Sequence, residues 1–136
     1  MLAGVMSISF IATPFAENYP SRPVQVIVPY AAGGGTDIAV RTVFNQISQD
    51  LGQQFVVLNR PGAGTTIGVQ QTASAKPDGY TVGFIDPAFA INTTLLPSVP
   101  YDPKSLQTVS LVTTTPLALA VPADRPWKSL KDLIAD

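Results

Sequence analysis

The sequence predicts an α/β fold built on a mostly parallel sheet. Short apolar segments alternate with helical patterns over residues 24–85, and the connections between them are short. This strand–helix–strand–helix–strand order favours parallel strands joined by right-handed crossovers. A length of 136 residues fits one domain with enough chain for a core.

The first strand is expected at residues 24–28, which are apolar on both faces, as a central parallel strand requires. A helix is expected over 37–51, because its apolar residues recur mostly at three- and four-residue spacing. Thr36 or Asp37 is the expected N-cap of this helix, and Gly52 is expected to end it.

The later elements are shorter. Residues 109–121 predict an extended segment, because consecutive threonines and Pro116 disfavour a helix. The other expected elements are a strand at 55–58, a small-residue helix near 66–75, a turn at 76–79, a strand at 80–85, a short helix around 88–95 and a helix from Ser129.

The composition excludes several kinds of site. The chain contains neither histidine nor cysteine, which removes Ser-His-Asp and Cys-His nucleophilic sites, His/Cys metal centres, disulfides and haem ligation. A formal net charge of −1 argues against a nucleic-acid partner, because such domains carry clustered Lys and Arg. We therefore expect no metal and no cofactor.

Residues 1–16 are uncharged and too short to span a bilayer. They are similar to the apolar and cleavage regions of a secretory signal, with cleavage after Ala16. The alternative is a buried N-terminal helix or strand. We expect export to the periplasm, and we treat 1–16 as a signal-peptide remnant outside the fold.

A glycine loop, Pro29-Tyr30-Ala31-Ala32-Gly33-Gly34-Gly35-Thr36-Asp37, joins the first strand to the first helix. The first turn of a helix has unpaired N–H groups and partial positive charge, and glycines let the backbone approach a ligand closely. The loop therefore predicts an anion site, although three glycines can also serve only to permit a tight bend.

A second glycine loop follows the second strand, Asn59-Arg60-Pro61-Gly62-Ala63-Gly64-Thr65-Thr66-Ile67-Gly68. Two such loops at one edge of a parallel sheet can grip a small anion between them. Neither loop is a P-loop, because no lysine follows it, and neither has the glycine spacing of a dinucleotide fingerprint.

Four side chains near these loops have open roles. Asp37 either caps the helix or accepts a hydrogen bond from a ligand or an ordered water. Arg60 either pairs with the ligand or braces its loop. Asp86 follows the third strand and is a candidate third contact, and Tyr30 either lines the pocket or fills the core. The expected ligand-binding residues are Tyr30, Ala32, Gly33, Gly34, Gly35, Thr36, Asp37, Gly62, Ala63, Gly64, Thr65 and Asp86, and no residue is expected to be catalytic.

These motifs, taken in order, resemble the Bug family, periplasmic solute-binding proteins of tripartite tricarboxylate transporters. The resemblance covers nearly all of 19–136. It is strongest in Ile27-Val28-Pro29-Tyr30-Ala31-Ala32-Gly33-Gly34-Gly35-Thr36-Asp37, Asn59-Arg60-Pro61-Gly62-Ala63-Gly64, Pro77-Asp78-Gly79-Tyr80-Thr81 and Pro100-Tyr101-Asp102-Pro103.

The resemblance implies a periplasmic-binding-protein-like lobe of the type II flytrap kind. In such proteins the two glycine loops of the first lobe hold a ligand carboxylate through backbone amides and ordered water, and membrane permease subunits receive the ligand. Family members are more than twice as long, so the second lobe is expected to be largely missing. Residues 17–121 are then an incomplete first lobe, and 122–136 are the crossover and the start of the second.

One departure from the family falls in the second glycine loop, where Thr65 stands in place of the last glycine of Gly-Ala-Gly-Gly. Threonine resists positive φ, so its amide can point differently, and its hydroxyl can act as a donor instead. Two alternatives to a carboxylate-binding fragment stay open. One is a phosphate-handling α/β enzyme domain that uses Asp37 or Asp86 as its base. The other is a nonfunctional gene remnant.

Overall fold

Strand β1 (Val24–Val28) lies at the centre of the sheet. The structure is a computed structural model that describes residues 18–114, 116 and 118–135. Strand β1 pairs in parallel with β2 (Phe55–Asn59) on one side and with β3 (Thr81–Gly83) on the other. Four of its five residues are fully buried, and only Gln25 is exposed. The predicted α/β fold with a parallel sheet and a central first strand is confirmed, whereas the signal-peptide prediction for 1–16 lies outside the described residues.

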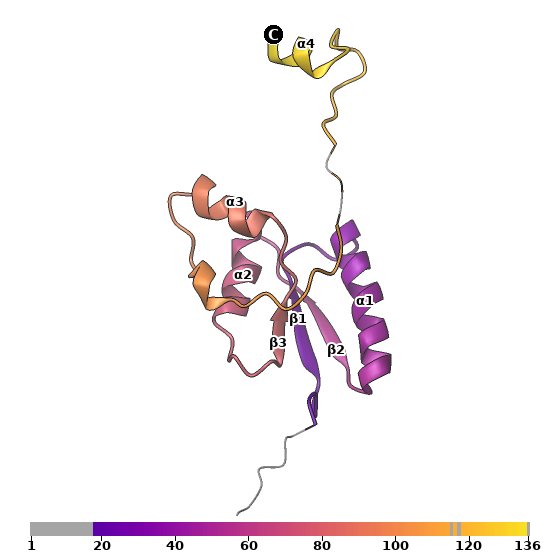
Figure 1. Cartoon of the computed structure of the whole chain (residues 1–136), viewed down its shortest axis with the longest axis vertical. Coiled ribbons are helices and arrows are strands. Elements are labelled where there is room, and N and C mark those ends of the chain that lie inside the picture. Colours follow the sequence, from indigo (N-terminus) through magenta and orange to yellow (C-terminus); the bar gives the residue numbers. More distant parts are fainter. Residues whose placement is uncertain (1–17, 115, 117, 136) are drawn as a thin grey trace, which may run out of the picture.

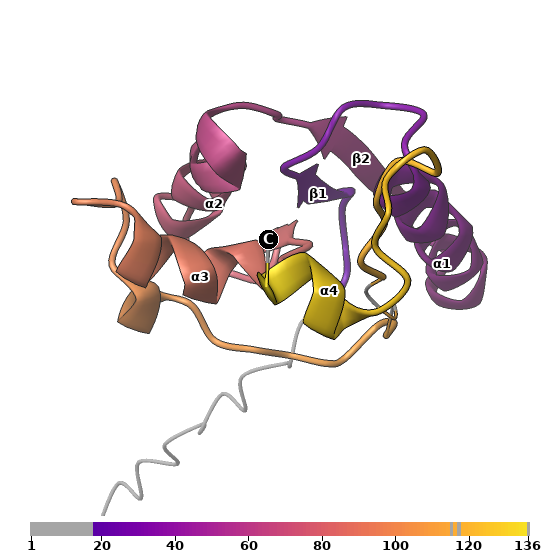
Figure 2. The ribbon, with the colours of Figure 1, turned by 90° about the horizontal axis from the view of Figure 1, so that it is seen from above.

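Helices cover both faces of the sheet. Figures 1 and 2 show α1 (Gly35–Leu51) and α2 (Thr66–Ala73) on opposite sides of the strands. On the α1 face, Val26 and Val28 pack against Val40. Partly buried apolar side chains surround this core: Tyr30, Phe44, Phe55, Val57, Val82 and Phe84.

Close approach of α2 to the sheet depends on two glycines. A Cβ at Gly68 would lie 2.8 Å from Pro29 Cβ, and one at Gly83 would lie 2.7 Å from the Thr72 side chain. Helix α2 therefore approaches both the end of β1 and the face of β3 closely, because neither glycine adds a side chain to the contact. This contact brings the second glycine loop against the first.

The start of α1 differs from the prediction. The helix begins at Gly35 with Gly34 as its N-cap, and no side chain caps it, so neither Thr36 nor Asp37 is the N-cap. Asp37 is the third helical residue, and its carboxylate instead reaches back to accept from the Gly33 N–H at 2.9 Å. This resembles the return bond of a capping box. Gly52 ends the helix in a left-handed conformation, as predicted.

The remaining elements are short. They are the 3₁₀ turns η1 (Ala63–Thr65) and η2 (Pro103–Ser105), helix α3 (Ala88–Leu95) and helix α4 (Leu130–Ala135). Strand β3 is shorter than predicted, although Tyr80 O and Phe84 N still bond to β1 at 2.9 Å.

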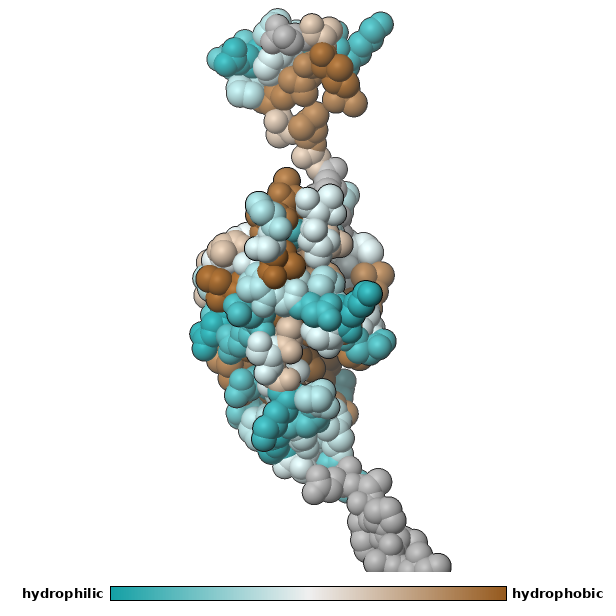
Figure 3. Space-filling view, turned by 90° about the vertical axis from the view of Figure 1, so that its left-hand side faces the viewer, coloured by the Kyte–Doolittle hydropathy of each residue, from teal (hydrophilic) through white to brown (hydrophobic). Residues whose placement is uncertain are grey.

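The segment after η2 leaves the sheet. Its described residues form no helix or strand before α4, in agreement with the extended segment expected at 109–121. Helix α4 lies away from the sheet at the end of this segment (Figure 1). Apolar side chains gather on α4 and on the chain that leads to it (Figure 3), and Val109 and Ile134 are 90% and 76% exposed. The predicted boundary at residue 121 stays a prediction.

Candidate ligand-binding site

Three loops meet at the carboxyl edge of the sheet, one after each strand. The Asn59 side chain at the end of β2 donates to Tyr30 O at 3.0 Å, and the Arg60 N–H donates to Val28 O at 2.7 Å. The Tyr30 hydroxyl donates to Asp86, which follows β3. The two predicted glycine loops are thus neighbours at one edge, where open α/β sheets bind ligands.

The first glycine loop presents backbone rather than side chains. Residues 31–35 are exposed, and Gly33 has a φ of 81°, which favours glycine. The Gly33 amide is already paired with Asp37. The amides that a helix leaves without an internal partner belong to its first turn, here Gly35, Thr36 and Asp37.

Asp37 is the hub that fixes this loop. Its side chain is buried and accepts from Arg41 Nε, Gly33 N and Asn59 Nδ2, each at 2.9 Å. The Arg41 guanidinium first, and then the Gly33 and Asn59 donors, hold the pKa of the Asp37 carboxyl well below its usual range. Arg41 thereby neutralises the carboxylate beside the predicted anion site. A ligand contact of Asp37 stays a prediction.

The second glycine loop has an unusual backbone. Gly62, Ala63, Gly64 and Thr65 all have positive φ, at 126°, 46°, 59° and 79°. Asn92 of α3 donates to Gly64 O at 2.6 Å, and the Thr65 N–H donates to Gly62 O at 3.0 Å. These bonds hold a conformation that alanine and threonine rarely adopt.

Tyr30 and Asp86 close the edge near β3. The Tyr30 ring packs on the core while its hydroxyl donates to Asp86, and its expected role as a wall of the ligand pocket stays a prediction. Burial, and then the Asp86 hydrogen bond, raise the pKa of Tyr30 to about 12. The other Asp86 oxygen accepts from the Ala88 N–H at 3.0 Å and so fixes the start of α3.

Arg60 braces its loop in this structure, and its pairing with a ligand stays a prediction. Its Nε donates to Gln71 Oε1 at 3.0 Å, and its Nη1 donates to Asn59 O at 3.2 Å. The side chains of Arg41, Asn59 and Asn92 also hold the two loops, although the sequence patterns assigned them no role. The i, i+4 spacing of Asp37 and Arg41 was a usable signal. No local signal marks Asn92, because it comes close to the second glycine loop only when the chain is folded.

A model of the family described as "Tripartite tricarboxylate transporter family receptor", TctC, matches residues 39–136. The chain belongs to this family. Its curated relatives include protein BugT of Bordetella pertussis, 41% identical over 92% of this chain and 40% of the relative. A UPF0065 protein of Bordetella bronchiseptica is 37% identical over 99% of this chain and 41% of its own length. The chain thus spans about two fifths of the length of these relatives.

Solved structures give the same result for the fold. A structure described as a periplasmic transporter is 48% identical, with a TM-score of 0.60 over 62% of this chain and 29% of that one. An R. palustris protein solved with adipate is 34% identical, with a TM-score of 0.59 over 63% of this chain and 29% of that one. A TctC solute-binding protein from Polaromonas is 38% identical, with a TM-score of 0.53 over 60% of this chain and 29% of that one. The described fold of this TctC chain is therefore part of a periplasmic-binding-protein fold.

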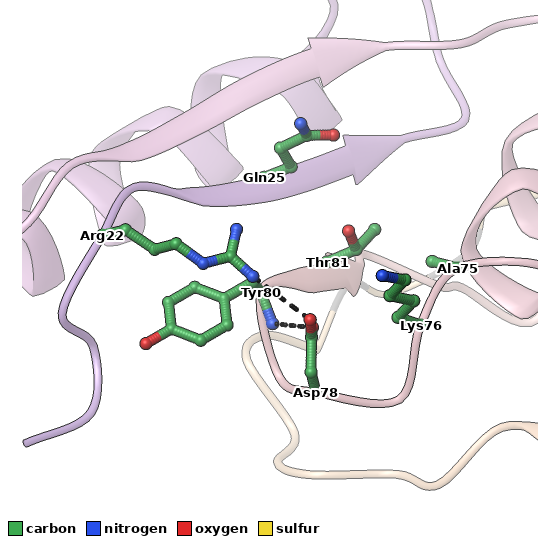
Figure 4. Close-up of a pocket in the computed structure, with 7 residues that line it drawn as sticks. All are labelled: Arg22, Gln25, Ala75, Lys76, Asp78, Tyr80 and Thr81. Carbon is green, nitrogen blue, oxygen red and sulfur yellow. Dashed lines mark hydrogen bonds and ion pairs between the residues drawn. The ribbon is translucent and has the colours of Figure 1, made fainter. Parts of the chain in front are cut away.

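A hollow of about 330 Å³ lies at the opposite edge of the TctC sheet (Figure 4). Arg22 pairs with Asp78 at 3.1 Å and lies 3.7 Å from the centre of the Tyr80 ring. Because Arg22 and Asp78 already pair with each other and the hollow lies away from both glycine loops, it is not where we place the ligand. Among the described residues, no three Asp or Glu side chains lie close enough together to hold a metal ion. None of the helices in that part of the chain combines the length and the apolar character that crossing a bilayer requires.

Proposed function

We propose that this chain binds a small carboxylate between its two glycine loops, outside the cytoplasm, for delivery to the permease subunits of a tripartite tricarboxylate transporter. The main support is the meeting of both loops at one edge of the sheet, joined by Asn59 and Arg60. The absence of histidine and cysteine, and a family of receptors, favour binding without turnover.

The chemistry of the cradle suits a carboxylate. Amides in the first turns of α1 and α2 supply donors and partial positive charge, while the Asp37–Arg41 pair adds no net charge. A hydrogen bond to a charged group contributes roughly 1.5–3 kcal/mol, and less where water reaches it. The R. palustris neighbour, solved with adipate, supports a dicarboxylate as the first ligand to test.

The test is a titration of the isotope-labelled chain, followed through its backbone amides, with adipate, citrate, malate, glutamate and benzoate. We expect weak binding, because the chain spans about two fifths of the length of its relatives and leaves part of the ligand exposed to water. Shifts should concentrate at 31–37 and 62–68. Inorganic phosphate is the comparison, and tighter binding of phosphate would favour the enzyme alternative instead.

A variant at the start of α1 sharpens this test. Gly35→Pro deletes one amide donor at the first helical position, where proline is well tolerated, and Gly34 already has the extended ψ of 165° that a residue before proline prefers. We expect it to weaken carboxylate binding several-fold while the chain stays folded. Gly35→Ala keeps the amide and should bind like the wild type. Equal binding by both variants would count against the cradle.

A further inference from the structure

Thr65 occupies the N-cap position of α2 but does not cap the helix. Threonine there ordinarily has an extended backbone, and its oxygen accepts from an amide of the first turn. Here its φ is 79°, its backbone is left-handed, and no side-chain capping bond forms. The side chain that would normally cap the start of α2 therefore makes no capping bond.

The hydroxyl of Thr65 is also buried without a partner. The residue is 8% exposed, and its Oγ1 has no hydrogen-bond partner among the described residues. A β-branched residue at positive φ and an unpaired buried hydroxyl are both costly. A glycine would avoid both costs, so the pair of costs at one residue points to a partner outside the chain.

The first turn of α2 has donors to offer beside this hydroxyl. The amides of Thr65 and Thr66 already donate to Gly62 O and Ala63 O. The next two residues, Ile67 and Gly68, are at the helical positions whose amides have no partner inside a helix. Gly68 packs against Pro29, so this turn borders the first glycine loop.

We propose that the Thr65 hydroxyl donates a hydrogen bond to the carboxylate bound at the start of α2, so that the ligand replaces the missing helix cap. The inference rests on the proposed function and adds a side-chain donor to a cradle of backbone amides. Such a donor favours an anionic headgroup with several acceptor sites. The corresponding amide, adipamide, offers fewer acceptors and no charge, so it should bind poorly.

Three variants separate the hydroxyl from the shape and the backbone of Thr65. Thr65→Val keeps the branched shape without the hydroxyl, Thr65→Ser keeps the hydroxyl, and Thr65→Gly removes both the hydroxyl and the unfavourable φ. In amide-detected titrations with adipate, we expect Val and Gly to weaken binding roughly tenfold or more, because a charge-assisted bond is lost. Serine should stay within about twofold of the wild type.

Ligand-free stability provides a second measurement. If the hydroxyl has no partner in the protein, Thr65→Val should melt at or above the wild-type temperature, and Thr65→Gly should melt higher because it accepts a positive φ. A clear loss of stability in Thr65→Val would overturn the inference, since it would reveal a partner within the chain.

The two proposals fail in different ways. Wild-type binding of adipate that Thr65→Val leaves unchanged would overturn this inference and leave carboxylate capture standing. No shift at either glycine loop with any carboxylate would overturn the proposed function, and the role of Thr65 with it.

Discussion

Asp37 shows how a carboxylate can lie beside the amides that we propose bind an anion. Its oxygens accept from Gly33, Arg41 and Asn59, so its negative charge is already balanced by donors within the protein. Those three donors come from the first glycine loop, from α1 and from the end of β2. One buried side chain therefore sets the position of both glycine loops, and we regard its main role as positioning.

Asp37 also predicts how stability depends on pH. Its pKa is lower in the folded chain than in the unfolded chain, so its stabilisation is complete above the ordinary carboxyl pKa of about 4. That stabilisation is lost as the pH falls below this value toward the folded pKa. Asp37→Asn should lower the urea midpoint at neutral pH and flatten the fall in stability between neutral and acidic pH.

The matched control for Asp37→Asn is Asp50→Asn, which removes the same charge near the exposed end of α1, where Asp50 accepts from Gln46. It should change the free energy of unfolding by no more than about 0.5 kcal/mol. If both variants lose the same stability with the same pH profile, Asp37 is not the hub described above.

At the scale of elements, the contact between α2 and β1 has no room for a side chain. A Cβ at Gly68 would also lie 3.0 Å from Arg60 O, so the clash involves backbone that cannot move aside. Gly68→Ala should lower the free energy of unfolding by about 1–3 kcal/mol and separate the two glycine loops. Chemical denaturation measures the first effect, and amide shifts at 59–65 measure the second.

The control for Gly68→Ala is Gly35→Ala, since a Cβ at Gly35 meets nothing within 4 Å. This variant should be as stable as the wild type or slightly more stable. A Gly68→Ala chain of wild-type stability would show that α2 does not pack on Pro29 as closely as described.

The sequence was sufficient to predict the strands, the long helix and the position of the glycine loops. Strand β1 and helix α1 follow local patterns of apolar residues, and Gly52 is a local stop signal. The role of Asp37 was harder to predict, because an acidic residue after three glycines suits a cap equally well. Its contact with Asn59 is fixed only when β1 and β2 pair.

The second glycine loop was predictable in outline but not in conformation. Local preference assigns negative φ to Ala63 and Thr65, whereas the structure gives both a positive φ. The Asn92 bond to Gly64 O, from a helix 28 positions later, helps to hold that backbone. Such distant support leaves no trace in the local pattern.

At the scale of the whole molecule, the sheet with its helices and the segment that leads to α4 should differ in resistance to protease. Trypsin cuts poorly before proline, which protects Arg22, Arg60, Lys76 and Arg125. Of the remaining four basic residues, Arg41 lies within the long helix α1 and Lys131 within the short helix α4, whereas Lys104 and Lys128 are exposed in short or irregular structure.

We therefore expect trypsin to cut first at Lys104 and Lys128 and to leave a fragment that ends at Lys104, because local unfolding is easiest there. Mass spectrometry of a time course identifies the cuts. Early cleavage at Arg41 would contradict the structure, since it requires α1 to open.

The strand order has a consequence for the chain during its synthesis. The ribosome makes β1 first, yet β1 lies between β2 and β3 and is buried by both. Among the described residues, one edge of β1 pairs with a strand that begins at residue 55, and the other edge pairs with a strand that begins at residue 81. The central strand is thus made before both of its partners, so the chain passes through an interval in which a chaperone can bind this apolar segment before the sheet forms.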